Sequence, residues 1–275
     1  MTVPSTQSGL KNIAARGDED LLHGFGQVEL WGRLGWQEVK RRYRRTALGP
    51  FWTAISLFVF VMALGSVGAG LLSRDMHDYL PFLVAGMVVW IMLSTIITEA
   101  CTLFVSGAAL VRQTRFNYSI LAYALVWRNL IVFLHNMIVW AVIYLIFAPD
   151  LINWKIVLAI PGLAFVFVNG VWISLLLGML CLRFRDVQQL VTSLVQIALF
   201  VTPIFWPPDK LDGMRRIIFV GLNPIYHHIT IIRDPLMGQL PALNSYIAVI
   251  LITVGGWTLT YFLFNKFRKR IPYWS

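Results

Sequence analysis

The sequence predicts an all-α integral membrane protein with six transmembrane helices. Six long apolar segments each reach the roughly 20 residues that a helix needs to cross a bilayer. The whole chain is 58% hydrophobic and only 13% charged, whereas soluble domains are about 25% charged. We expect the spans at residues 50–72, 80–105, 121–147, 156–182, 187–206 and 246–264.

The basic residues predict the orientation of these spans. An even number of spans leaves both termini on one side, and basic loops are retained in the cytoplasm. The terminal side carries the basic run at residues 40–45, directly before the first span, and a basic tail at residues 266–270. We therefore expect cytoplasmic N- and C-termini. The net charge of +10 is interpreted as a topology signal, and nucleic acid is not expected as a partner.

Three segments outside the spans have their own character. Residues 1–27 form a polar N-terminal tail. Residues 28–45 predict an amphipathic helix on the inner membrane surface, although Glu38 and Arg42 fall on its apolar side and weaken the pattern. Residues 214–240 contain apolar runs that are too short to cross, which favours a re-entrant or interfacial helical hairpin on the outer side. A solvated outer loop is the alternative for this last segment.

The sequence contains few groups that suggest chemistry. No G-x-x-x-x-G-K-[ST] motif occurs, so a P-loop is absent from this chain, and no metalloprotease or hydrolase motif occurs either. Asp75 and Asp78 fit a solvated loop better than a metal site. Glu99 and Arg128 are expected at the same inner boundary. They either form an ion pair or extend separately to the interface, and both interpretations remain open.

Several stretches, taken in order, resemble one family, the membrane subunit of ABC exporters for lipid-linked polysaccharides. This ABC-2 class includes the O-antigen (Wzm-type), capsule and teichoic-acid permeases. The resemblance extends from about residue 25 to the end of the chain. It is carried by residues 42–52 (RYRRTALGPFW), 183–190 (RFRDVQQL), 199–206 (LFVTPIFW), 223–225 (NPI), 233–236 (RDPL) and 270–273 (RIPY).

The resemblance implies a transport subunit that is not itself an enzyme. Residues 46–275 would form a six-helix ABC-2 transmembrane domain in the bacterial cytoplasmic (inner) membrane. The family works as a homodimer with two separate ATP-binding cassette ATPase subunits, which bind ATP and Mg²⁺, so no cofactor is expected in this chain. The cargo would be a polysaccharide on an undecaprenyl-diphosphate-type lipid, such as O-antigen, moved out of the cytoplasm.

The resemblance also assigns candidate roles to individual residues. Arginine side chains match phosphate oxygens in a bidentate geometry, so a group at the first span is expected to attract the pyrophosphate of the lipid-linked substrate or to anchor anionic lipids. This group consists of Arg41, Arg42, Arg44 and Arg45. Contact with the ATPase is expected from the amphipathic helix at 28–45, from the segment 107–119 and from the turn after the fourth span. The candidate residues in the last two segments are Arg112, Arg115, Arg185 and Asp186.

Aromatic residues within the spans suggest a path for the polymer, because aromatic rings stack on the apolar faces of sugars. Packing against lipid or other helices is the alternative for each ring. The candidates for this path are Phe51, Phe58, Trp140, Phe200 and Trp206.

Two other functions compete with glycan export. The first is an ABC-2 exporter of a lipid or a drug. The second, of a different class, is a membrane-embedded polyprenyl-phosphate transferase. Such a transferase needs clustered acidic residues for a metal–diphosphate, and the apolar region of this sequence offers only Glu99, with Asp186 at an inner boundary.

Overall fold

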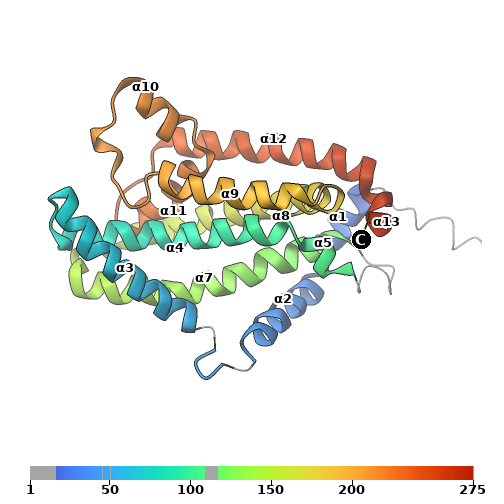
Figure 1. The fold of residues 1–275 in the computed structure, drawn as a ribbon, viewed down its shortest axis with the longest axis horizontal. Coiled ribbons are helices and arrows are strands. Elements are labelled where there is room, and N and C mark those ends of the chain that lie inside the picture. The colour runs from blue at the N-terminus through green and yellow to red at the C-terminus, as the bar shows by residue number, and fades with distance from the viewer. Residues whose placement is uncertain (1–16, 45, 50, 109–116, 275) are drawn as a thin grey trace, which may run out of the picture.

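The computed structural model describes residues 17–44, 46–49, 51–108 and 117–274, and every regular element in these ranges is helical. Figure 1 shows long helices running side by side along the longest axis, with short helices at both ends of the bundle. Five helices are long and apolar enough to cross a membrane. These are α3 (Phe51–Leu72), α4 (Met76–Ala100), α7 (Ser119–Phe147), α8 (Ala159–Arg183) and α12 (Leu243–Phe267).

The expected fifth span differs from the structure in length. The sequence predicts this span at residues 187–206, but the helix α9 covers only Asp186–Val201. Its 16 residues correspond to a length of about 24 Å, which is shorter than the roughly 30 Å of a hydrocarbon core. The helix ends because Thr202, which precedes Pro203, adopts an extended conformation (φ −83°, ψ 135°). A residue before proline is sterically disfavoured in the helical region. By its own length, α9 is therefore a short apolar helix.

Helix α4 is the centre of the bundle. It packs against α3, α7, α8 and α9, and it is buried along nearly its whole length. Its start is capped by Asp75, whose carboxylate accepts a hydrogen bond of 2.9 Å from the backbone N–H of His77. The expected span 80–105 is therefore shifted: α4 begins at Met76 and ends at Ala100, and the separate helix α5 (Leu103–Ser106) follows.

The segment after α9 folds as a helical hairpin. Its first arm contains α10 (Gly213–Arg216) and a π-helical turn at Ile217–Gly221, and its second arm is α11 (Pro224–Leu236). Asn223 caps α11 by accepting hydrogen bonds from two backbone N–H groups, and Pro224 occupies the first helical turn. Helix α11 is mostly buried against α4, α8 and α12, so this arm belongs to the core and is not a solvated loop.

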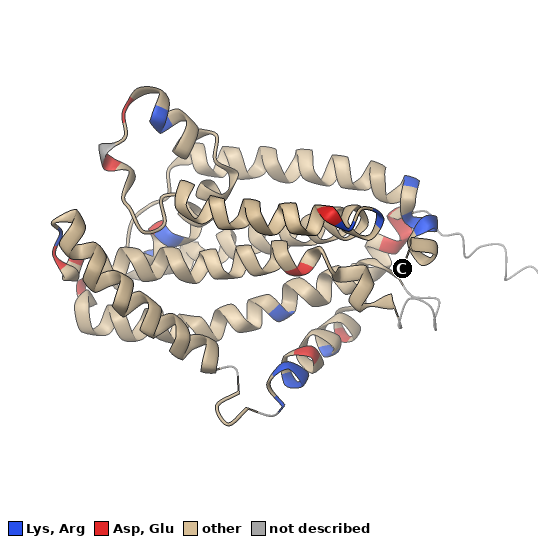
Figure 2. Cartoon of the chain, viewed as in Figure 1, with Lys and Arg blue, Asp and Glu red and all other residues tan. Residues whose placement is uncertain are grey.

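The two ends of the described chain meet at one end of the bundle. Within the segment expected to be a polar tail, Gly17–Gly26 forms the helix α1, which packs against α7 and α12. The C-terminal helix α13 (Ile271–Trp274) lies near α1 in Figure 1. Figure 2 shows most charged residues at the two ends of the bundle, with long uncharged stretches between them. This distribution is what a membrane-spanning bundle requires, because charges are costly within hydrocarbon.

Candidate functional site

The helix α2 (Val28–Tyr43) is held against α7 by a narrow buried face. Trp31, Gly35 and Val39 are buried at four-residue intervals, the spacing of one helix face. The Trp31 ring lies 5.8 Å from the Trp127 ring of α7. A Cβ atom at Gly35 would lie 2.8 Å from the backbone oxygen of Ala124, so glycine permits the two helix backbones to approach this closely.

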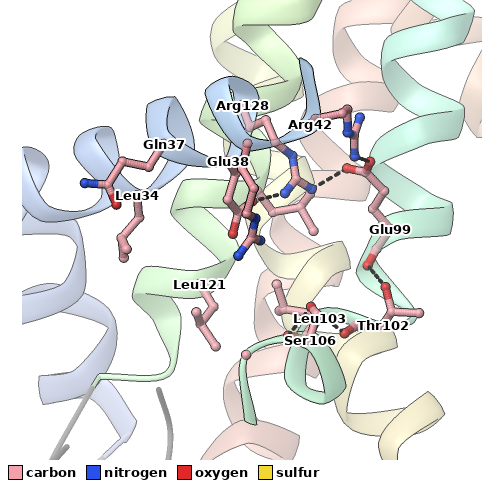
Figure 3. A pocket seen from close by; sticks show the side chains of 13 residues that line it. Leu34, Gln37, Glu38, Arg42, Glu99, Thr102, Leu103, Ser106, Leu121 and Arg128 are labelled. Carbon is pink, nitrogen blue, oxygen red and sulfur yellow. Dashed lines mark hydrogen bonds and ion pairs between the residues drawn. The ribbon is translucent and has the colours of Figure 1, made fainter. Parts of the chain in front are cut away.

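Four charged side chains join α2 to α4 and α7. Arg128 of α7 forms ion pairs with Glu38 of α2 and Glu99 of α4, and Glu99 also forms an ion pair with Arg42 of α2. Figure 3 shows Arg128 between the two carboxylates and Arg42 reaching Glu99 from the other side. Asn129 donates a further hydrogen bond of 2.9 Å to Glu99. The charges therefore alternate in sign along a continuous network, which we call the Glu38–Arg128–Glu99–Arg42 network.

Much of this network is shielded from solvent. The side chains of Arg128 and Glu99 are only 13% and 19% exposed. Burial by itself lowers the pKa of Arg42, but the hydrogen bond and charge of Glu99 outweigh that effect and raise the pKa above its ordinary value. Arg42 therefore stays charged. In a partly buried ion-pair network of this kind, separating any one member from its partner leaves an unpaired charge, which is costly. The network therefore holds α2 at a fixed angle to the bundle.

A cavity of about 530 Å³ opens beside the network. One part of its wall is polar and the other part is apolar. The polar part includes Arg41, Gln37, Thr102 and Ser106 in addition to the four network residues, and the apolar part includes Leu34, Leu103, Leu121 and Leu125. Among the described residues, Nε of Arg128 has no hydrogen-bond partner. The wall thus combines three arginines and two glutamates with an apolar surface.

The structure distinguishes among the four arginines predicted to meet a pyrophosphate. Arg41 lines the cavity, whereas Arg42 lines it while already paired with Glu99. Arg44 is exposed just after the end of α2, and Arg45 lies outside the described residues. The ion pair between Glu99 and Arg128 is confirmed.

Sequence reasoning missed the role of Glu38 in this site. The only signal for it was a misfit, since Glu38 and Arg42 interrupt the apolar face of α2. The structure explains the interruption, because both side chains turn towards charged partners on the bundle. Two charged residues four positions apart on an otherwise apolar helix face are therefore the sequence signal of this docking contact, and they do not indicate a weak helix.

The residues expected to contact an ATPase are only partly described. Arg112 and Arg115 lie outside the described residues. Arg185 and Asp186 are exposed at the start of α9. The neighbouring Arg183 places its guanidinium 5.4 Å from the Trp274 ring of α13, so this turn lies at the same end of the bundle as the C-terminus.

The aromatic candidates do not form one surface within a single chain. Phe51 and Phe58 are exposed on α3. Phe200 is 67% exposed at the end of α9. The indole N–H of Trp206 donates a hydrogen bond of 3.0 Å to the backbone carbonyl oxygen of Phe200. Trp140 is buried in α7, where its ring lies 4.6 Å from that of Tyr144. Trp140 thus packs in the core of the chain, and the exposed rings lie on α3 and near the end of α9.

Known proteins are similar to this chain over most of its length. An O-antigen export system permease protein RfbA of Klebsiella pneumoniae is 26% identical over 245 residues, covering 85% of this chain and 90% of that protein. A second protein of that name from the same organism is 24% identical over 242 residues, with the same coverage. The RfbA protein of Myxococcus xanthus is 23% identical over 195 residues, covering 70% of this chain and 75% of its own length.

The family assignment rests on the match to a family model. The model of the ABC-2 type transporter family matches residues 29–237 of the 275 residues, which is more than half of the chain. The matched region begins in α2 and ends just after α11, so it contains the network, the cavity and four of the five long apolar helices. This chain therefore belongs to the ABC-2 type transporter family.

Proposed function

We propose that this chain is the membrane subunit of an ATP-driven exporter that moves a lipid-linked polysaccharide, such as O-antigen, out of the cytoplasm. The observation that carries this proposal is the similarity to three O-antigen export permeases over most of the chain. Because the sequence has no P-loop, ATP and Mg²⁺ would be bound by a separate ATPase subunit. Two copies of the chain and two ATPases would form the exporter in the inner membrane.

The proposed topology has six spans, with α9 as the fifth. A 16-residue helix is short for a span, but the following residues 202–206 extend the chain beyond its end. The bilayer can also thin around a short span at modest cost. Both termini would be cytoplasmic, which agrees with α1 and α13 lying at one end of the bundle (Figure 1). The buried helix α11 would then re-enter the membrane from the outer side, shielded by α4, α8 and α12.

Helix α9 supports both the homodimer and the polymer path. Its residues Val191, Leu194 and Ala198 line a cavity towards the body of the chain. At about 100° per residue, the opposite face of the helix carries Gln189, Ser193, Gln196 and Phe200. No residue of α9 is buried within the chain. Glutamine side chains facing lipid would lose their hydrogen bonds to water, so this face is better suited to a second copy or a hydrated glycan.

The path between two copies can be tested by cysteine labelling. In vesicles that hold the dimer with its ATPase, a water-soluble maleimide is expected to label Gln196→Cys and to label Ala198→Cys poorly. Hydration of the outward face is the reason for this difference. If only a lipid-soluble reagent labels Gln196→Cys, the outward face of α9 meets lipid, and the proposed path is wrong.

The cavity beside α2 is proposed as the site that receives the pyrophosphate of the cargo. Arg41 lines the cavity and forms no ion pair with another described residue, and the apolar wall suits the first isoprenoid units. Replacement of Arg41 by glutamine is expected to slow export. The matched control is Arg33→Gln, since Arg33 is an exposed arginine of the same helix that pairs with Glu29. If Arg41→Gln is correctly inserted and exports at the normal rate, the cavity does not receive the pyrophosphate.

The function itself can be tested by reconstitution. The chain and its ATPase, placed together in vesicles with an undecaprenyl-diphosphate-linked glycan, are expected to move that glycan across the bilayer only when ATP is hydrolysed. Movement of a drug or a plain lipid with no movement of the glycan would favour another ABC-2 exporter. Transfer of sugar by the purified chain without any ATPase would show a membrane-embedded transferase and overturn the proposal.

A further inference from the structure

The carboxylate of Asp20, in the N-terminal helix α1, is completely buried at the end of the bundle that holds both termini. It accepts hydrogen bonds from the backbone N–H groups of Tyr118 and Ser119, at 3.1 and 3.0 Å, and from the Ser119 hydroxyl, at 2.7 Å. It also pairs with Arg268, whose Nε and Nη2 atoms lie 2.7 and 2.6 Å away. One carboxylate thereby joins three segments that are far apart in the sequence.

Asp20 caps α7 from outside that helix. The first residues of a helix have backbone N–H groups without partners, and a carboxylate near them is further stabilised by the helix dipole. The N-cap residue of α7, Tyr118, provides no side-chain cap of its own. Asp20 fills that role, and its charge is balanced by Arg268, which follows α12 directly. The position of α7 is therefore linked to the positions of α1 and the C-terminal segment.

The packing around Asp20 leaves little freedom for α1 to move separately. A Cβ atom at Gly24 would lie 2.0 Å from the Ser119 hydroxyl oxygen, so a larger residue there could not be accommodated in this arrangement. The backbone N–H of Gly17 donates a hydrogen bond of 2.7 Å to the side chain of Asn265 in α12. Helix α1 is thus attached at its start to α12 and further along to the start of α7. We call Asp20, Ser119 and Arg268 the terminal clasp.

The place of the terminal clasp in the chain suggests its purpose. Tyr118 and Ser119 form the end of the segment 107–119 that the sequence predicts to contact the ATPase. A force applied to this segment must pass into α7 through residues that Asp20 holds. We propose that Asp20 is a positioning residue that couples movement of the ATPase contact to α7 and to the C-terminal end of α12. This inference rests on the proposed function, because it assumes an ATPase partner.

The test compares Asp20→Asn with Glu19→Gln, which removes an exposed carboxylate from the neighbouring position of α1. The complete complex is reconstituted, and ATP hydrolysis, glycan export and the amount of assembled complex are measured together. For Asp20→Asn, the amount of glycan exported per ATP hydrolysed is expected to fall about tenfold, a common size for coupling between sites. Glu19→Gln is expected to keep the wild-type ratio.

Two further variants separate positioning from folding. Ser119→Ala removes one hydroxyl donor and keeps the backbone contacts, so it tests the clasp even if Asp20→Asn does not assemble. Arg268→Met combined with Asp20→Asn should lower the ratio less than the product of the two single effects, because both act through one contact. If the assembled variants export as much glycan per ATP as the wild type, Asp20 only stabilises the fold and the inference is wrong. If the wild-type complex hydrolyses ATP without moving glycan, the proposed function fails instead.

Discussion

Replacing Glu38 by glutamine is expected to loosen α2 from the bundle while leaving the helices themselves intact. Glu38 is the carboxylate of α2 in the Glu38–Arg128–Glu99–Arg42 network, and it pairs with Arg128 of α7. Glutamine has nearly the same shape and retains one acceptor oxygen. The change therefore removes the negative charge without opening a cavity, and its effect reports on the ion pairs.

The size of the effect follows from the exposure of each partner. The Glu38 and Arg128 side chains are only 31% and 13% exposed, so the loss of their pair is expected to cost about 2 kcal/mol. This pair joins α2 to α7, so the free energy of docking α2 should fall by the same amount. That change corresponds to a roughly 30-fold larger undocked population.

Hydrogen exchange of the α2 amides measures this population directly, because local opening exposes them to solvent. In the matched control, Glu29→Gln, the lost partner is Arg33 on the same helix, and both side chains are more than 70% exposed (74% and 77%). The control should change exchange by less than about threefold, since exposed pairs contribute only a few tenths of a kcal/mol. If exchange in α2 rises no more for Glu38→Gln than for Glu29→Gln, the network does not hold α2 against the bundle.

Two further predictions concern packing. Gly35→Ala should displace α2 and speed proteolysis of the segment before α3, because the new Cβ would lie 2.8 Å from a backbone carbonyl oxygen of α7. The control is Gly32→Ala, which should leave the cleavage rate unchanged because no atom lies within 4 Å of its Cβ. Arg233→Met should destabilise the turn after α9 by about 2 kcal/mol, because the buried Arg233 donates a hydrogen bond of 2.8 Å to the Pro203 carbonyl oxygen. Faster hydrogen exchange at residues 202–206 would reveal this loss of stability. The control is Arg216→Met, since Arg216 is exposed. Equal exchange in the two variants would contradict the assigned role of Arg233.

Most of the fold could be predicted from the sequence because long apolar runs have few alternatives in a membrane protein. Backbone polar groups within hydrocarbon must be satisfied internally, so a run of about 20 apolar residues becomes a helix. The exception is instructive. The apolar run at 187–206 continues past Pro203, but the helix ends at Val201, because hydropathy does not register the steric effect of a proline on the preceding residue.

The candidate site was less predictable, because its residues come from three helices. The basic run 40–45 indicated an orientation and a possible contact with phosphate, but it did not distinguish Arg42, which pairs with Glu99, from Arg41, which lines the cavity. Only the crossing of α2 over α4 and α7 makes that distinction. Asp20 was even less visible, since its partners lie 98 to 248 positions away in the chain.

The sequence by itself determined the class of this protein: an apolar helical bundle in a membrane, charged at its ends, with the ordered motifs of the ABC-2 type transporter family. These properties depend on the composition and order of residues along the chain, which hydrophobicity and local sterics translate directly into helices. The tertiary structure decided which charges are paired, which aromatic rings are buried and which helix face stays uncovered. Those outcomes depend on distances between helices, and residues far apart in the sequence become neighbours only when the bundle has packed.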